Sequence, residues 1–256
     1  LGPCAPFNVT LELMRDTAIL ARKYGVRLHT HLAETKDEDD FCEKTYGKRP
    51  LQLMEELGWV GEDVWYAHGI HFTDDELLLL KNSKTGIAHC PASNMRLGSG
   101  IARIPDMLKM NIPVGLAVDG SASNDASDMV GEMRLALLLH RVNSGADAIT
   151  AEQVLEMATL GSAKLLGRNA IGSLEVGKAA DIAIFELNKL EYTGALSDPL
   201  AALIFSGFNH QTFMTIVNGK IVVKDGQLVN VDEEKIIRNG NKISSALLAK
   251  RAKKQK

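Results

Sequence analysis

One stretch of this sequence decides the fold, VWYAH at Val64–His68. It is a short apolar run of strand-forming residues that ends in a histidine. Similar runs occupy residues 26–31, 85–90 and 112–119, and stretches with helical spacing of apolar residues separate them. Short strands that alternate with helices are typical of a parallel α/β architecture. The sequence therefore predicts a parallel sheet with helical connections.

Polar residues that bind metals or move protons stand at or near the ends of these four runs: His31, His68, His89 and Asp119. Parallel strands that are covered on both faces are normally apolar, so such residues need a reason. A single strand histidine is more often a hydrogen-bonded core residue, but four strand ends together favour one shared site. In a (β/α)8 barrel, catalytic groups lie at the carboxyl ends of the strands. We therefore expect a TIM-type barrel architecture with a functional site at its mouth.

Two further polar residues lie near the first of these strand ends. Glu34 follows His31 by three residues and can turn over the same mouth. A carboxylate beside a bound cation can move protons, although an ordinary loop acid is the alternative interpretation. His29 shares a strand face with His31, because side chains alternate along a strand. It forms a metal-binding pair with His31 or lies one layer lower in the barrel.

The bulk composition argues against several classes of protein. The chain has 256 residues and a formal net charge of −3, and five of its last seven residues are basic, so the remaining body is acidic. We expect no nucleic-acid partner. Apolar runs are too short for a membrane span, so no membrane partner is expected. Three cysteines without a CxxC pattern indicate no disulfide framework and no thiolate zinc site, which favours a cytoplasmic location.

Helical spacing and capping residues predict the helices. Thr10 and Thr150 are candidate N-caps, and Asp74 and Glu76 suit the first turn of a helix that begins near Thr73. The expected helices lie at about residues 10–24, 37–57, from 73 onward, 104–110, 128–143, 150–166, 194–206 and 232–254.

The pattern changes after Gly167. Residues 180–185 and 215–226 are strand-like, and the second run contains Asn218-Gly219, a strong hairpin signal. The helix near residues 194–206 is expected to return to the barrel. We assign a partial hydrolase barrel to residues 1–170, a composite β subdomain to 171–230 and a charged C-terminal helix to 231–256. The opening residues, with no initiator methionine or signal peptide, are interpreted as the interior of a longer protein.

Five segments carry the chemistry-bearing residues in compact patterns: HLAE at 31–34, AHGIH at 67–71, HCPASNMRL at 89–97, DGSASND at 119–125 and GSLEVGKAAD at 172–181. In this order they resemble motifs of the amidohydrolase superfamily, in its cytosine deaminase-like and chlorohydrolase group. The third and fourth segments are most similar to the 8-oxoguanine deaminase-like branch. The resemblance extends to about residue 230.

This resemblance implies the C-terminal half of a (β/α)8 barrel, about strands 5–8, with a composite β subdomain. It also implies one divalent metal, with zinc favoured and Fe²⁺ as the alternative, bound by His31 and Asp119. The family's remaining ligands are an HxH pair on an upstream strand, and His29 with His31 is not that pair.

Site roles follow from the same resemblance. Asp119 accepts a proton from the metal-activated water, Glu34 protonates a ring nitrogen, and His68 hydrogen-bonds the attacking oxygen. Cys4 stands where nucleoside-specific relatives usually have histidine, which favours a flat base as substrate, although a small buried hydrophobe is the alternative interpretation. The expected pocket residues are Cys4, Phe7, His89 and Asn94.

The function expected is hydrolytic deamination of an aminated nitrogen heterocycle, such as 8-oxoguanine, a pterin or a related base, with release of ammonia. One alternative is a triazine-type chlorohydrolase or alkylaminohydrolase, because the metal chemistry is the same. An alternative of another class is a non-catalytic fragment or binding module. The partner expected is a small heterocycle, the full-length form is expected to be a homo-oligomer, and the chain alone is expected to be inactive.

Overall fold

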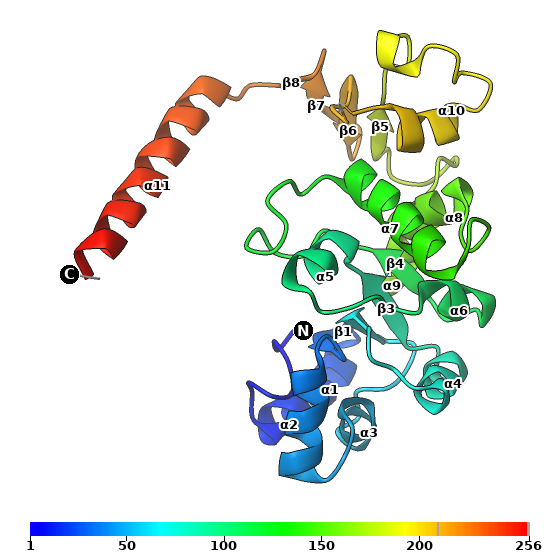
Figure 1. The fold of residues 1–256 in the computed structure, drawn as a ribbon, viewed down its shortest axis with the longest axis vertical. Helices are drawn as coiled ribbons and strands as arrows, with labels where there is room; N and C mark the ends of the chain where they lie inside the picture. Colours follow the sequence, from blue (N-terminus) through cyan, green and yellow to red (C-terminus); the bar gives the residue numbers. More distant parts are fainter. Residues whose placement is uncertain (209, 255–256) are drawn as a thin grey trace. The chain divides into compact units, whose positions relative to one another are not determined.

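The computed structural model describes residues 1–208 and 210–254, which fall into two compact units (Figure 1). The first unit contains Leu1–Lys178 and Leu187–His210. The second contains Ala179–Glu186 and the chain from Gln211 onward. The chain therefore crosses into the second unit for one short segment, returns to the first, and then completes the second.

A four-stranded parallel sheet forms the centre of the first unit. Its strands pair in sequence order: β1 (Leu28–Leu32), β2 (Val64–His68), β3 (Gly86–His89) and β4 (Val114–Leu116). The outer edge of β1 is lined by the extended backbone of residues 1–4. There the Leu1 amine donates to Arg27 O at 2.7 Å, and His29 N donates to Leu1 O at 2.9 Å. The parallel α/β architecture expected from the sequence is confirmed.

Helical segments follow each strand of this sheet. Thr10 caps α1 by accepting from Leu13 N at 3.2 Å, and Thr73 forms a capping box with Glu76 at the start of α4. These helix starts agree with the sequence prediction. The helices are α1 (Leu11–Tyr24), α2 (Lys36–Tyr46), α3 (Pro50–Glu56), α4 (Asp74–Ser83), α5 (Pro91–Leu97), α6 (Ile104–Lys109), α7 (Met129–Ser144), α8 (Ala151–Glu156) and α9 (Ser162–Leu165).

Two helix predictions need correction. The region at residues 37–57 is two helices rather than one, because Gly47 ends α2 in the left-handed conformation and Pro50 starts α3. The helix α5 was not predicted, although Pro91 at its first turn and Gly98 as its left-handed cap are both start and stop signals. The helix expected at 150–166 is present, with a π-helical turn at Met157–Gly161 between α8 and α9.

Packing on the sheet combines large buried side chains with a close approach at one glycine. Tyr66 donates its hydroxyl to Trp59 O, and the Trp59 indole donates to Met14 O at 2.8 Å, which ties α1 to β2. A Cβ at Gly86 would lie 2.2 Å from a Leu165 methyl. The close approach of α9 to the sheet therefore requires glycine at this position.

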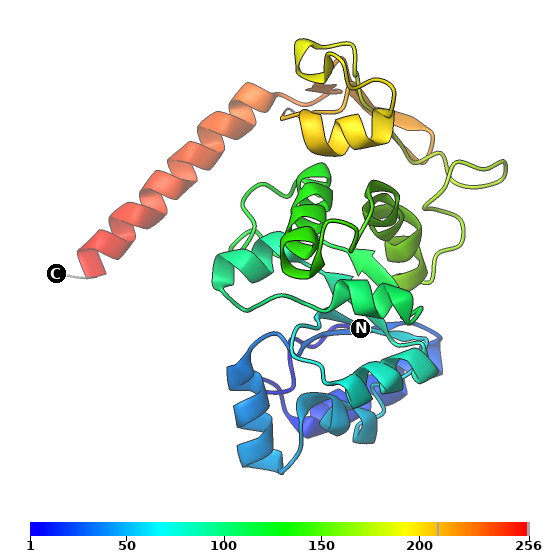
Figure 2. The same ribbon diagram turned by 45° about the vertical axis from the view of Figure 1, so that its right-hand side comes forward.

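The segment that returns to the first unit packs on α7. It contains the short helix α10 (Pro199–Ala201) and a π-helical turn at Ala202–Ser206, so the helix expected at 194–206 begins later than predicted. Arg134 of α7 donates to Gly207 O at 3.0 Å, and the Arg141 guanidinium lies 5.3 Å from the Phe205 ring centre. Figure 2 shows α7 and α8 side by side within this unit.

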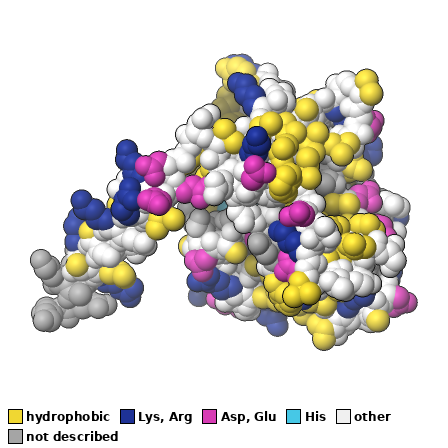
Figure 3. Space-filling view, turned by 90° about the horizontal axis from the view of Figure 1, so that it is seen from above, with side chains coloured by type: hydrophobic (Ala, Val, Ile, Leu, Met, Phe, Trp, Pro, Cys, Tyr) yellow, Lys and Arg dark blue, Asp and Glu magenta, His cyan; other side chains and the backbone are white. Residues whose placement is uncertain are grey.

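The second unit is an antiparallel sheet followed by a long helix. Its strands pair in the order β5 (Ile182–Ile184), β6 (Met214–Val217), β7 (Lys220–Lys224) and β8 (Gln227–Leu228). The hairpin between β6 and β7 turns at Asn218-Gly219, with φ of 47° and 77°, as that dipeptide predicts. The helix α11 (Glu233–Lys254) carries exposed hydrophobic side chains between charged ones (Figure 3). Among the described residues, no helix is long and apolar enough to cross a membrane.

Candidate metal and catalytic site

Three side chains from different strand ends converge at the carboxyl edge of the parallel sheet. His31 lies near the end of β1, His68 is the last residue of β2, and Asp119 follows β4. One potential ligand atom from each, a ring nitrogen or a carboxylate oxygen, lies within 4.8 Å of the other two. Within the described part of the chain, this is the one group of three such residues that meets this criterion. Imidazole nitrogen and carboxylate oxygen are donors that suit zinc.

Hydrogen bonds fix the two histidine rings. The Nδ1 atom of His31 lies 2.6 Å from Cys4 O, and Nδ1 of His68 lies 2.8 Å from Asn94 Oδ1. Both partners accept hydrogen bonds, so each Nδ1 carries a hydrogen, and in the neutral form of the ring the lone pair lies on Nε2. Metal-binding histidines are commonly held in this way by a second partner. The residues present therefore fit a divalent metal.

Asp119 is held through one of its carboxylate oxygens. Ser93 Oγ donates to Oδ2 at 2.5 Å and Ser123 Oγ donates to the same atom at 2.9 Å. Burial acts to raise the pKa of Asp119, but hydrogen bonds from Ser93, the Gly120 backbone and Ser123 outweigh it, and the pKa lies below the ordinary value. The carboxylate is therefore ionised at neutral pH, as a metal ligand or a proton acceptor must be.

Left-handed backbone conformations surround this site. Ala33, His68 and Asp119 have φ of 53°, 74° and 64°, which costs about 1–3 kcal/mol for each non-glycine residue. In the strand register, His68 pairs with Leu32, and His31 pairs with Ala67, the residue before His68. A regular strand would place His68 on the opposite face from His31, so the left-handed turn at its backbone is what brings the two rings together.

Glu34 lies beside His68 at the site. Its Oε2 atom is 3.6 Å from Nε2 of His68. The residue follows the left-handed turn at Ala33, which carries the chain from the end of β1 into α2. A titratable carboxyl group thus lies next to the cluster, in position for proton transfer to a bound molecule.

The structure does not bring His89 to the cluster. Its side chain is fully buried, and its Nε2 lies 3.0 Å from Nε2 of His140 on α7. Burial lowers the pKa values of both rings, well below 6.5 for His89 and to about 4 for His140. We therefore propose no pocket role for His89.

His29 also lies apart from the cluster. Its ring stacks on Trp65 with 3.7 Å between ring centres. Burial, followed by the neighbouring His31, lowers the pKa of His29 to about 4. Of the two alternatives considered for this residue, the geometry favours a position one layer below the site.

The other expected pocket residues occupy different surroundings. Cys4 is exposed and its thiol accepts from Asn8 Nδ2 at 3.2 Å, while its carbonyl holds His31. Phe7 is half-exposed and packs edge-to-face on Phe41. Asn94 is buried and orients His68.

The sequence interpretation missed the residues that support the site. Ser93 and Ser123 hold Asp119, and Glu132 of α7 accepts from Ala92 N at 3.1 Å and from Asn124 at 2.8 Å. Both serines lie inside the motifs already singled out, at 89–97 and 119–125, so those motifs contained the available signal. Glu132 lies outside them and required the fold.

The fold and the site together define an α/β protein of the TIM-barrel type with a candidate metal centre at its strand ends. Residues 1–222 match the amidohydrolase family, and the chain belongs to that family. The membership expected from the five motifs is confirmed.

Curated relatives include several deaminases. The chain is 47% identical to 8-oxoguanine deaminase of Pseudomonas aeruginosa over 97% of this chain and 55% of that protein. It is 36% identical to isoxanthopterin deaminase of an unknown prokaryotic organism, over 94% of this chain and 53% of that protein. It is 38% identical to 5-methylthioadenosine/S-adenosylhomocysteine deaminase of Pyrococcus abyssi, over 96% of this chain and 58% of that protein. The chain spans about half the length of these relatives.

Solved structures of the same fold contain zinc. An atrazine chlorohydrolase from Arthrobacter aurescens complexed with zinc matches with a TM-score of 0.90 and 37% identity, over 93% of this chain and 53% of that one. An adenosine deaminase from Xanthomonas campestris with bound zinc matches with a TM-score of 0.93 and 31% identity, over 97% of this chain and 57% of that one.

Proposed function

We propose that the full-length protein is a metal-dependent hydrolytic deaminase of an aminated nitrogen heterocycle, of the 8-oxoguanine or pterin type. The observation that carries the proposal is the convergence of His31, His68 and Asp119, with Glu34 3.6 Å from His68. The 47% identity to an 8-oxoguanine deaminase supports the substrate class.

His31 and Asp119 are the proposed metal ligands, with the remaining ligands supplied from outside this sequence. Zinc is the proposed metal and Fe²⁺ the alternative. When bound, such a metal lowers the pKa of water toward neutrality and so supplies a nucleophile at neutral pH. This assignment also treats the sheet as about strands 5–8, the C-terminal half of a (β/α)8 barrel.

The chain's own residues then carry the proton transfers. Asp119 is ionised, so it accepts the proton of the attacking water and later passes it to the leaving amine. His68 accepts a hydrogen bond from that water at Nε2, because Asn94 holds its Nδ1 hydrogen. Glu34 donates a proton to the ring nitrogen beside the attacked carbon, and it recovers a proton from the hydroxyl group of the adduct as the ring carbonyl forms. Ammonia leaves and a ring carbonyl remains.

Cys4 and Phe7 support a flat base over a nucleoside as the substrate. Both side chains are exposed, the Cys4 carbonyl lies beside His31, and neither side chain offers a charged or strongly polar group to a ribose or a carboxylate. We further propose a homo-oligomeric, cytoplasmic full-length enzyme.

A substrate panel tests this function in the full-length protein. Ammonia release from 8-oxoguanine, isoxanthopterin, guanine and cytosine is compared with release from adenosine and S-adenosylhomocysteine. The proposal expects the highest kcat/KM for a base. A nucleoside with the highest kcat/KM would overturn the substrate class, and no ammonia release from any compound would overturn deamination.

A second candidate is chloride or alkylamine release from a triazine, which the likeness to atrazine chlorohydrolase favours. The same panel extended with chlorinated and alkylaminated triazines separates the two. Chloride release that exceeds ammonia release in kcat/KM would favour the second candidate.

A further inference from the structure

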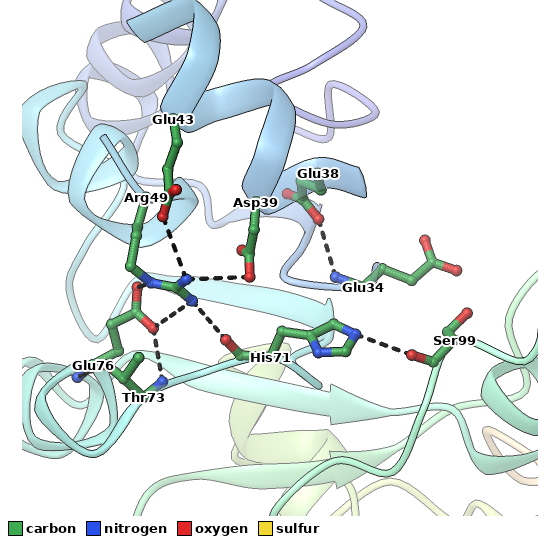
Figure 4. A network of polar contacts seen from close by, with 9 residues as sticks. All are labelled: Glu34, Glu38, Asp39, Glu43, Arg49, His71, Thr73, Glu76 and Ser99. Atoms are coloured by element: carbon green, nitrogen blue, oxygen red, sulfur yellow. Dashed lines mark hydrogen bonds and ion pairs between the residues drawn. The ribbon is translucent and has the colours of Figure 1, made fainter. Parts of the chain in front are cut away.

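Glu38 of α2 is a buried carboxylate to which the proposed chemistry gives no role. It is 3% exposed, and burial raises its pKa to about 7. Its Oε2 accepts a hydrogen bond from the backbone N–H of Glu34 at 3.0 Å (Figure 4). Within residues 1–208 and 210–254 no ion pair involves Glu38, and the backbone N–H groups of Glu34 and Ala33 are what act against burial to lower its pKa. A carboxylate in such a place is costly to bury, so its presence calls for a reason.

The hydrogen bond that Glu38 accepts completes a clamp on one peptide group. The Glu34 N–H and the Ala33 carbonyl belong to the same peptide unit. The carbonyl accepts from Ile70 N at 2.8 Å and from His71 N at 3.0 Å, while Glu38 holds the N–H. This peptide follows the left-handed Ala33 and directly precedes the Glu34 side chain. The clamp therefore sets the direction in which Glu34 leaves the backbone.

Ordinary helix capping does not account for this contact. Thr35 and Glu38 have the T-x-x-E spacing of a capping box, as do Thr73 with Glu76 in α4. In α4 the glutamate accepts from the N–H of the cap residue itself, and the threonine accepts from the glutamate N–H. In α2 the threonine makes no such cap bond, and Glu38 reaches one residue further, to Glu34. The same sequence pattern thus gives a hydrogen bond to the cap residue in α4 and a hydrogen bond to the residue before the cap in α2.

Arg49 holds the two sides of the clamp together. Its guanidinium donates to Asp39, next to Glu38 in α2, at 3.2 Å and to the His71 carbonyl at 2.7 Å (Figure 4). It also pairs with Glu76 at 2.9 Å. These contacts fix α2 against the segment that follows β2, which supplies the amides on the carbonyl side of the clamp.

We propose that Glu38 is a positioning residue: its carboxylate fixes the Ala33–Glu34 peptide and so aims the Glu34 carboxyl group at the substrate. The inference rests on the proposed function for its catalytic consequence. The clamp itself is a property of the backbone and can be measured without substrate.

The test compares three variants of the full-length, metal-loaded protein: Glu38→Ala, Glu38→Gln and, as a matched truncation at the third residue of α8, Gln153→Ala. The Glu38→Ala variant should lose about 10- to 100-fold in kcat, the scale of lost supporting hydrogen bonds, with KM and metal content little changed. The Glu38→Gln variant should recover much of kcat, because its amide oxygen still accepts from Glu34 N–H. The Gln153→Ala variant should keep normal kcat.

Amide hydrogen exchange of a peptide spanning residues 32–36 gives the second readout. Exchange should rise in Glu38→Ala and stay near wild type in Gln153→Ala. Normal kcat or unchanged exchange in folded Glu38→Ala protein would overturn the proposal, as would equal kcat losses in Glu38→Ala and Gln153→Ala. If Glu38→Ala does not fold, Glu38→Gln alone tests the proposal. Amide exchange equal to wild type would show an intact clamp, so a kcat loss above 100-fold in the same variant would overturn the proposal. A wild-type protein that deaminates nothing would instead overturn the proposed function, while the exchange result would still test the clamp.

Discussion

His68 and His89 end neighbouring parallel strands, yet their side chains have different partners. His68 is 1% exposed and joins His31 and Asp119, whereas His89 is 0% exposed and faces His140 on α7. The difference lies in the backbone: φ is 74° at His68, and His89 is not among the residues with positive φ. Of these two strand ends, the one with the left-handed turn, at His68, contributes its histidine to the site.

The residue that follows each histidine shows how the two ends differ. Gly69 continues the left-handed turn after His68 with φ of 60°. A Cβ at Gly69 would lie 3.0 Å from Phe72 and 3.1 Å from Ile87, so this turn has little room for a side chain. After His89 the chain runs through Cys90 into Pro91, the first residue of α5. The glycine is thus the local signal that separates the two ends.

The largest effect should come from Glu34, beside the His68 end. Glu34→Gln removes the proposed acid, so kcat should fall by about 10²- to 10⁴-fold while metal content stays intact. Steady-state kinetics and metal analysis of the full-length protein check this. The exposed acid Glu62 offers a control, since Glu62→Gln should behave as wild type. Near-normal turnover in Glu34→Gln would remove Glu34 from the mechanism.

A direct comparison of the two strand ends comes next. His68→Gln should lower kcat by about 10²-fold, the scale of misplacing a reacting group, because it removes the ring that orients the attacking water. His89→Gln should keep kcat within a few-fold but lower the free energy of unfolding by about 1–3 kcal/mol, because it disturbs a buried hydrogen bond. Kinetics and urea unfolding of both variants test the pair. The reverse pattern would mean that His89, and not His68, belongs to the site.

The smallest effect concerns pH and the His89 end alone. The pKa of His140 is about 4 in the folded chain and 6.5 for the ordinary group, so between these values the unfolded chain binds more protons. The contribution of His140 to the free energy of unfolding should be fully present above pH 6.5. It should fall as the pH drops toward 4, by at most about 1.4 kcal/mol per pH unit. Between pH 7 and pH 5, urea unfolding should show a smaller loss in free energy of unfolding for His140→Gln than for the wild-type protein. Equal losses in both proteins would rule out this contribution.

Much of the fold could be predicted from local signals. The four strand runs, the caps at Thr10 and Thr73 and the Asn218-Gly219 turn each depend on a few adjacent residues, and the structure agrees with them. The helical region at residues 37–57 divides into α2 and α3, because Gly47 ends one helix and Pro50 starts the next, and helical spacing alone does not show this division.

The site was harder to predict, because it depends on which face of the sheet each strand end presents. The sequence indicated His31, His68 and Asp119, which the fold brings together, and also His89, which it does not. Alternation along a strand cannot show where a left-handed residue will break it. The supporting bond from Glu38 joins residues that are close in sequence, but its burial and its partner depend on how the chain packs.

The most direct test of the account is the position of the metal in the full-length protein. A zinc-loaded crystal structure, with zinc located by anomalous scattering, should place His31 Nε2 and an Asp119 carboxylate oxygen about 2.0–2.2 Å from the ion. His68 should lie beside it, and His89 should remain against His140. A zinc ion bound elsewhere, or an ion from which His31 or Asp119 points away, would contradict the account.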